Sequence, residues 1–297
     1  MAASVSWELY RSFLAVLSEG SLSGAARALD IAQPTVGRHV AALERSLGVP
    51  LFTRSQTGLL PMESALSLRT YAEAMSNSVA ALERAASGQG SGVRGVVRVT
   101  ASEVIGVEVL PRIIARLREK HGELQVELVV SDRMQDLLQR EADIAVRMAR
   151  PTQALLIARR IGHVGLGLYA TRQYVKRHGA PETIADLQRH ALIGFDQLTP
   201  FIRSAGKAFP AVHREAFAMR ADSGLAQLAL IRCGAGIGIC QVPIATRDGL
   251  VRVLRKQFSL QLDTWIAMHE DLRGSLRCRV TFDALVEGLQ EHVAGAS

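Results

Sequence analysis

The polar side chains with the most informative spacing lie on one predicted helix near the N-terminus. This helix begins at Gln33-Pro34 and ends before Gly48, because proline is tolerated in a first helical turn and glycine favours a helix end. Its tip and outer face carry groups suited to base edges and phosphates: Gln33, Pro34, Thr35, Arg38, His39 and Arg45. Glutamine can bond an adenine edge and arginine a guanine edge, so this face predicts contact with the major groove of double-stranded DNA.

Two earlier helices and a following wing would position that face. One helix ends at Gly20-Ser21, and a second runs from about Ser23 to Leu29 before a three-residue turn. The apolar residues of the helix pair recur at helical spacing, which buries them together: Ala25, Ala26, Leu29, Val36, Val40 and Leu43. After Gly48 the segment 51–58 is typical of a wing, with Phe52 in the core and Arg54 reaching a phosphate. The pattern therefore predicts a winged helix-turn-helix over residues 1–61, although a helix-turn-helix spacing alone also occurs in other helical bundles.

A long helix and a flexible hinge follow. Residues 62–88 predict one linker helix with a heptad-like seam, made of Leu68, Tyr71, Met75, Ser78, Leu82 and Ala85. Such a helix is too thin to form a core alone, so we expect it to dimerise the chain, the alternative being a surface helix packed on its own chain. Glycine and serine dominate 87–92, which predicts a hinge at 89–92 before a domain over 93–297.

From residue 93 onward, strand and helix patterns alternate, which predicts an α/β domain with a parallel sheet. The first elements expected are strands at 96–101, 124–130, 142–146, 155–161 and 166–170, with helices at 107–121 and 134–139. Helices at 172–177, 225–233 and 276–293 are interleaved with strands at 192–195, 216–220, 236–240, 250–253 and 263–268. This region is long enough for one large domain or two small lobes.

Composition and the remaining motifs narrow the functional classes. The formal net charge is +7, but residues 1–90 hold seven Arg against seven Asp or Glu, so charge alone is weak evidence for DNA binding. The three cysteines form no disulfide framework, and neither a secretory signal nor an apolar run of membrane-spanning length is evident, so a cytoplasmic protein without membrane contact is expected. The glycine run 234–238 follows a helix and enters a strand, the reverse of a dinucleotide-binding turn. Cys240 lacks a sequence partner for nucleophilic chemistry, and the consecutive residues 269–271 diverge too much to share a metal. No cofactor, no metal and no enzymatic activity are therefore expected.

The full N-terminal string resembles the LysR-type transcriptional regulators. The matching positions are Phe13–Val16, Gly20-Ser21, Ala25-Ala26, Leu29, Gln33-Pro34, Val36, Leu43-Glu44, Leu47-Gly48 and Leu51-Phe52-x-Arg54. Fainter similarity follows in 95–99, Asp143-Ile144-Ala145, 234–238 and 269–273. The sequence departs from the family pattern at Gly37, where a serine is usual, at Ala32, and at Met62, Ser64 and Ala65 after the wing. These departures change individual phosphate contacts rather than the fold.

The resemblance implies an architecture that spacing does not. The C-terminal domain would be periplasmic-binding-protein-like, with lobe I at 93–164 and 270–297, lobe II at 165–269, and two crossing strands between them. A small-molecule effector would bind in the cleft, and the working species would be a homodimer or a homotetramer. The positions carried over as effector-binding are Ser102, Glu103, Ser131, Arg147, Phe201 and Asp222. Hydroxyls and amides beside Ser102 suit an anion, whereas the Glu103 carboxylate favours a cationic or neutral polar ligand, and both remain open.

Three functional hypotheses follow. The first is a sequence-specific DNA-binding transcription regulator whose effector alters DNA bending or promoter activity. The second is a metabolite-binding protein whose N-terminal helices only oligomerise it. The third, an enzyme that uses the α/β cleft, lacks paired carboxylates, a metal cluster or a nucleophile elbow in this sequence.

Overall fold

The computed structural model describes residues 5–55, 58–87, 92–132, 142–151, 156–197 and 213–295. Its contacts divide the chain into two compact units, one made of the residues up to Glu83 and one that begins at Arg84. Each unit has its own core and is described separately. The expected helix at 134–139 and Phe201 lie outside the described residues.

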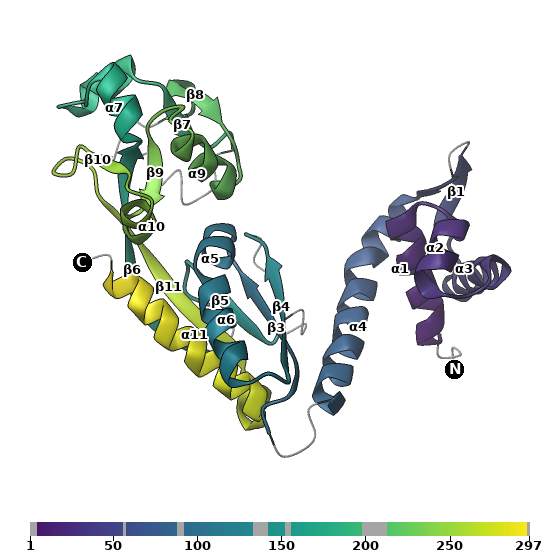
Figure 1. The fold of residues 1–297 in the computed structure, drawn as a ribbon. Helices are drawn as coiled ribbons and strands as arrows, with labels where there is room; N and C mark the ends of the chain where they lie inside the picture. The colour runs from purple at the N-terminus through teal and green to yellow at the C-terminus, as the bar shows by residue number, and fades with distance from the viewer. Residues whose placement is uncertain are drawn as a thin grey trace. The chain divides into compact units, whose positions relative to one another are not determined.

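The first unit is a winged helix-turn-helix, as the sequence predicts (Figure 1). Its elements are α1 (Trp7–Glu19), α2 (Leu22–Leu29), α3 (Gln33–Leu47), β1 (Phe52–Ser55), β2 (Gly58–Pro61) and the part of α4 (Glu63–Ser87) up to Glu83. The boundaries follow local chemistry. Ser21 caps α2 by accepting the Gly24 N–H at 3.0 Å, and Gly20 and Gly48 end α1 and α3 with φ of 65° and 71°.

Helix α4 has one packed face and one open face. Ala65 and Ala72 are buried against the core of the first unit, and Leu68 packs on the same cluster. Outside that face, large apolar side chains are exposed along the helix: Leu66 by 53%, Tyr71 by 73%, Met75 by 40% and Leu82 by 69%. The expected seam is therefore divided, because Leu68 serves the core while Tyr71, Met75 and Leu82 remain uncovered within this chain.

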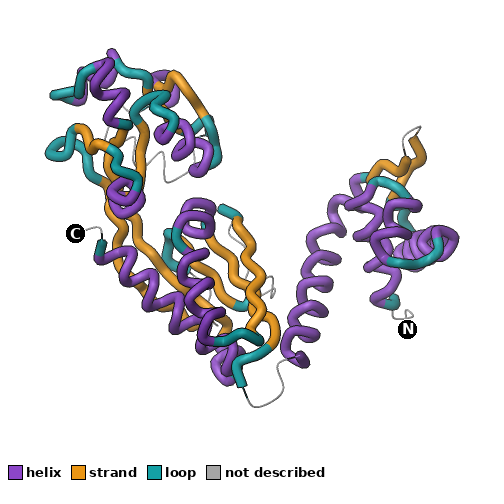
Figure 2. Tube along the Cα trace, in the orientation of Figure 1, coloured by secondary structure: helices purple, strands orange, loops and turns teal. Residues whose placement is uncertain are grey.

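The second unit contains two lobes, as the resemblance implies (Figures 1 and 2). Lobe I comprises β3 (Gly95–Ala101), α5 (Glu103–Glu108), α6 (Leu110–Lys120), β4 (Leu124–Val130), β5 (Ile144–Arg147), η4 (Glu270–Gly274) and α11 (Leu276–Ala294). Lobe II comprises α7 (Arg172–His178), η2 (Ile184–Arg189), β7 (Leu192–Gly194), η3 (Arg214–Ala216), β8 (Phe217–Arg220), α9 (Gly224–Arg232), β9 (Gly238–Gln241), α10 (Val242–Arg247) and β10 (Val251–Val253). Two long strands, β6 (Leu156–Ala170) and β11 (Leu260–His269), pair antiparallel and join the lobes.

Strand β6 corrects the expectation of two strands at 155–161 and 166–170. The intervening Gly162 does not turn the chain; it has φ of 153°, and a Cβ placed there would lie 2.8 Å from Val293 Cγ1. Glycine is thus needed because α11 packs closely against the strand. A register shift between Thr264 and Trp265 on β11 accommodates this irregularity and leaves β6 continuous.

The helix expected at 107–121 is also wrong, since two helices occupy 103–120. Val109 has φ of −118° and separates α5 from α6. Pro111, in the next turn, has no N–H to donate to a carbonyl four residues earlier, which disfavours a continuous helix at this point.

The expected parallel sheet is a mixed sheet. In it, β3 pairs parallel with β4 and β5, while β7 and β8 form a separate two-stranded parallel sheet. By contrast, β6 pairs antiparallel with β9, β10 and β11. Helices α5 and α6 form the crossover that lets β3 and β4 pair in parallel, whereas β6 runs opposite to the strands that pair with it.

Lobe I encloses a buried ion pair beside its apolar core. The Asp143 carboxylate accepts from Arg84 Nε at 3.2 Å, from Arg84 Nη2 at 3.4 Å and from the Arg98 main-chain N–H at 2.8 Å. Both side chains of the pair are 8% exposed. Arg277 donates to the Arg84 carbonyl at 2.7 Å, so the first residue of this unit is fixed by side-chain and main-chain contacts.

Candidate DNA-binding and effector sites

Helix α3 presents the predicted DNA-binding side chains at its exposed N-terminal half. Gln33, Pro34 and Arg38 are exposed, and Thr35 is partly exposed. Arg38 Nη2 donates to Thr35 Oγ1 at 3.2 Å, which places the two side chains together on one turn. Opposite them, Val36 and its neighbours at helical spacing are buried against α1 and α2. The helix therefore packs on one face and offers hydrogen-bonding groups on another.

His39 lies at the border of this face and contacts the first helix. Its Nδ1 is 2.8 Å from Oγ of Ser12, a serine of α1 that is 1% exposed. Only Nε2 of the imidazole is then left for a partner outside the unit. Arg45 is exposed near the other end of α3.

The wing is fixed to the helical core from both sides. The Glu44 carboxylate accepts the N–H groups of Leu51 and Phe52 at 2.7 and 3.3 Å, which ties the wing to the end of α3. At the wing tip, the Leu59 N–H donates to the Gly20 carbonyl at 2.8 Å, and a Cβ at Gly58 would lie 2.4 Å from that oxygen. Gly58, with φ of 142°, is thus required by this close approach. Arg54 is exposed on β1.

Four of the predicted effector residues gather at the carboxyl ends of the lobe I strands. Ser102 follows β3, Ser131 follows β4 and Arg147 ends β5, while Glu103 begins α5. The Glu103 N–H donates to Asp132 Oδ1 at 3.0 Å, so a carboxylate of the protein already occupies the first amide of α5. Ser102 Oγ is buried and has no hydrogen-bond partner among the described residues, so its hydroxyl could bond a ligand at this edge.

Arg147 brings a partly buried guanidinium to the same edge. Its Nη1 donates to the Val146 carbonyl at 3.0 Å and its Nη2 to Thr100 Oγ1 at 2.9 Å. Burial lowers its pKa from the usual value, an effect opposed by the charge of Asp132. Each terminal nitrogen therefore commits one of its two N–H groups to the protein.

Lobe II supplies Asp222 and a residue that the sequence reasoning missed. Asp222 Oδ1 accepts the N–H groups of Asp196 and Gln197 at 3.1 and 2.8 Å, and together with Asp196 it lines an open hollow at the end of β8. The next residue, Ser223, donates its hydroxyl to Glu103 Oε2 at 2.7 Å and so joins the two lobes. Ser223 also caps α9 by accepting the Ala226 N–H, and this capping pattern was the sequence signal that could have drawn attention to it.

Other chemistries have little support within the described part of the chain. Among those residues, no group of three or more His, Cys, Asp or Glu side chains is arranged to hold a metal ion. Burial raises the pKa of Cys240 to about 12, which disfavours a nucleophilic thiolate. No helix among them is both long and apolar enough to cross a membrane.

Comparison with known proteins agrees with this architecture. Residues 7–66 match the model of the bacterial regulatory helix-turn-helix protein, lysR family, and residues 90–290 match that of the LysR substrate binding domain. The HTH-type transcriptional regulator CrgA of Neisseria meningitidis serogroup C (strain 8013) is 27% identical over 289 residues, covering 95% of this chain and 97% of the relative. The solved structure of CrgA, a LysR-type transcriptional regulator, aligns at 26% identity with a TM-score of 0.60, over 97% of this chain and 99% of that one. Full-length CbnR complexed with its target DNA has the same fold, with 18% identity, a TM-score of 0.67 and coverage of 98% and 100%.

These matches settle the choice between the hypotheses drawn from the sequence. Both units of the chain correspond to the two parts of one kind of regulator, and the relatives named above are transcription regulators rather than enzymes. The helix-turn-helix is the DNA-binding part, and the two-lobed unit is the effector-binding part. The chain belongs to the LysR family of transcriptional regulators.

Proposed function

We propose that the chain recognises a specific double-stranded operator through α3. A small molecule that binds at the facing edges of the two lobes would alter DNA bending or promoter activity. The observation that carries this proposal is the hydrogen-bonded pair of partly exposed Thr35 and exposed Arg38 on a helix whose opposite face is buried. Base-edge contacts from such a helix confer sequence selectivity, while Arg54 and Arg45 add phosphate contacts. Binding to DNA would place the protein in the cytoplasm.

The exposed residues of α4 favour a homodimer. Tyr71, Met75 and Leu82 are large apolar side chains that share one exposed side of the helix, at spacings of four and seven residues, and a second copy of α4 would bury them. Two helix-turn-helix units joined in this way would contact two half-sites of an operator with two-fold symmetry. A homotetramer would arise from a second contact between such dimers.

For the effector, the polar edge of the lobes favours a neutral or cationic polar molecule over a simple anion. Asp132 already accepts the first α5 amide, Glu103 adds a second carboxylate, and the terminal nitrogens of Arg147 donate to protein oxygens. Ser102 would offer its hydroxyl to the same ligand. The proposed domains are a DNA-binding domain at 1–61, a linker helix at 62–88, a hinge at 89–92 and an effector domain at 93–297, with lobe II at 165–269.

A salt-titrated binding assay tests the DNA-binding proposal. The full-length protein is titrated with the intergenic DNA upstream of its own gene and with shuffled DNA of equal length. A preference of about 4 kcal/mol or more for the upstream DNA is expected at physiological salt. Thr35→Ala with Arg38→Ala should abolish that preference.

Arg69→Ala serves as the matched control. It also removes an exposed arginine from the first unit, but that arginine lies on α4 and pairs with Glu73 at 2.7 Å. It should therefore leave the preference unchanged. Equal binding to both DNAs, lost together as salt rises, would contradict sequence-specific recognition of that site.

A further inference from the structure

Helix α5 belongs to lobe I, yet it contacts lobe II near both of its ends. At its first residue, Glu103 Oε2 accepts from Ser223 Oγ at 2.7 Å. One residue later, Val104 packs against an apolar cluster of lobe II, and a Cβ at Gly224 would lie 2.9 Å from Val104 Cγ2. The final residue, Glu108, makes the third contact.

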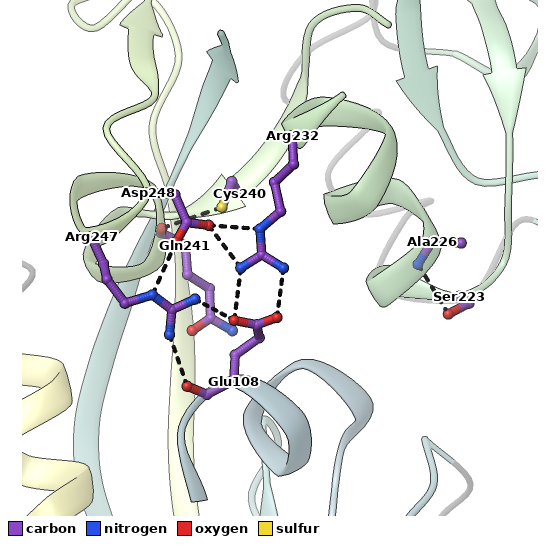
Figure 3. A network of polar contacts seen from close by, with 8 residues as sticks. All are labelled: Glu108, Ser223, Ala226, Arg232, Cys240, Gln241, Arg247 and Asp248. Carbon is purple, nitrogen blue, oxygen red and sulfur yellow. Dashed lines mark hydrogen bonds and ion pairs between the residues drawn. The ribbon is translucent and has the colours of Figure 1, made fainter. Parts of the chain in front are cut away.

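Glu108 is part of an ion-paired quartet with Arg232, Arg247 and Asp248 (Figure 3). Arg232 donates to the two carboxylate oxygens of Glu108 at 2.7 and 2.8 Å, a bidentate geometry. Arg247 contacts the same carboxylate and also donates to the Glu108 carbonyl at 3.0 Å. Asp248 accepts from Arg232 Nε at 2.8 Å and from Arg247 Nε at 3.0 Å, so each carboxylate touches both guanidinium groups.

The two carboxylates of the quartet are better sheltered from water than those of a surface ion pair, while Arg232 is 36% and Arg247 29% exposed. The side chains of Glu108 and Asp248 are only 11% and 15% exposed. Hydrogen bonds from Arg232 hold the pKa of Glu108 at about 2, so its carboxylate stays charged at any physiological pH. Between described residues, the other end of α5 is joined to lobe II by one hydrogen bond, and that bond lies among the candidate effector residues.

We propose that the quartet is the pivot about which the two lobes turn, and that the Glu103–Ser223 hydrogen bond is the contact that breaks when they turn. An effector that binds Glu103 or Ser223 would replace this single hydrogen bond, and lobe II would then turn about the quartet. The part of this proposal that concerns the effector rests on the proposed function, whereas the pivot is a property of the effector domain itself. The pivot predicts that lobe orientation stays narrowly distributed while the quartet is intact and becomes broad when it is broken.

The test measures the distance between the lobes by single-molecule fluorescence in the full-length protein without DNA or effector. Dyes are attached through Glu119→Cys on α6 and Lys176→Cys on α7, both exposed positions, in a Cys233→Ser background. Cys240 and Cys278 are buried and stay unlabelled. Labelled chains are diluted in unlabelled protein, so that only distances within one chain are read.

Glu108→Gln removes the central charge, and the population in other lobe arrangements should rise about tenfold or more. Glu103→Ala, at the contact that breaks, should have a smaller effect. Glu291→Gln is the control, because it makes the same Glu→Gln change in an ion pair, with Arg116 at 3.1 Å, that is exposed and lies inside lobe I. It should leave the distribution as in the parent protein.

Arg232→Lys provides a second variant that keeps the charge and loses the bidentate geometry, and it should broaden the distribution to an intermediate width. An unchanged distribution in Arg232→Lys, or in a folded Glu108→Gln, would overturn the pivot. So would equal broadening in Glu291→Gln, or a larger effect of Glu103→Ala than of Glu108→Gln. Because no DNA or effector is present, failure of the DNA-binding assay leaves this result intact.

Discussion

Removing the buried carboxylate of Asp143 should destabilise the effector domain far more than removing an exposed one. In Asp143→Ala, the Arg84 guanidinium loses its carboxylate at a position that is 8% exposed, and the Arg98 N–H loses its 2.8 Å acceptor. Removing one partner of a buried ion pair typically costs about 3–5 kcal/mol, because the remaining charge stays out of water. We expect a loss in this range for the free energy of unfolding.

Tryptophan fluorescence during urea denaturation can isolate this effect. The chain has two tryptophans, and Trp7→Phe leaves Trp265, on β11 of the effector domain, as the only one. The matched control is Asp263→Ala, because that carboxylate pairs with Arg160 at 2.8 Å but is 42% exposed. An exposed pair contributes about 0–1 kcal/mol, so the control should shift the urea midpoint only slightly.

A double substitution makes the physical cause testable. Asp143→Asn keeps an oxygen for the Arg98 amide, and combining it with Arg84→Met removes both charges together. If the cost comes from the buried Arg84 charge losing its pairing with Asp143, the double variant should be more stable than Asp143→Asn alone. A loss in Asp143→Ala no larger than that in Asp263→Ala would refute the reasoning, as would strictly additive effects in the double variant.

Three further predictions concern the wing and the response to acid. Glu44→Ala should destabilise the first unit by about 1–3 kcal/mol and weaken operator binding, since two wing amides lose their acceptor; Glu44→Gln should retain most of both in circular dichroism melts and DNA titrations. Because the pKa of Glu108 is lowered from 4.5 to about 2, its contribution to stability is present above pH 4.5 and is lost as pH falls toward 2. The urea midpoint should therefore depend less on pH in Glu108→Gln than in the parent protein. The same pH dependence in both proteins would contradict the lowered pKa of Glu108. Burial lowers the pKa of His292 below 6.5, so the parent protein should lose stability as pH falls below 6.5. The His292→Gln variant should show a weaker dependence of the urea midpoint on pH in this range. An equal dependence in the two proteins would contradict the lowered pKa.

The sequence predicts the first unit well because its boundaries are local. Gly20 and Gly48 adopt the left-handed backbone that ends a helix, and Pro34 lies in the first turn of α3. Each of these helix boundaries is therefore determined by one or two residues. The apolar spacing of the helix pair then identifies the buried face. Helix boundaries and a buried face of this kind can be predicted without knowledge of the rest of the chain.

The effector domain is harder to predict because its decisive contacts are distant in sequence. Gly162 is typical of a strand break until α11 is seen packed against it, more than 100 residues later. Glu103 and Ser223 are 120 residues apart, and Glu108 and Arg232 are 124 apart, so no periodicity relates them. Asp143 falls in a family motif, yet its partner Arg84 lies at the end of a helix that the sequence assigns to dimerisation. The contacts of these residues depend on which elements pack together in the folded domain, and that packing is not visible in local sequence patterns.

The route of the chain through the two lobes sets an order for their synthesis. Lobe II is built from one continuous stretch between β6 and β11, whereas the core of lobe I takes Phe282, Leu285 and Leu289 from α11. On the ribosome, lobe II can therefore close while lobe I still exposes apolar strands that were made earlier. Until α11 emerges, the nascent chain carries an unfinished lobe I, which is the stage most open to chaperones and to aggregation.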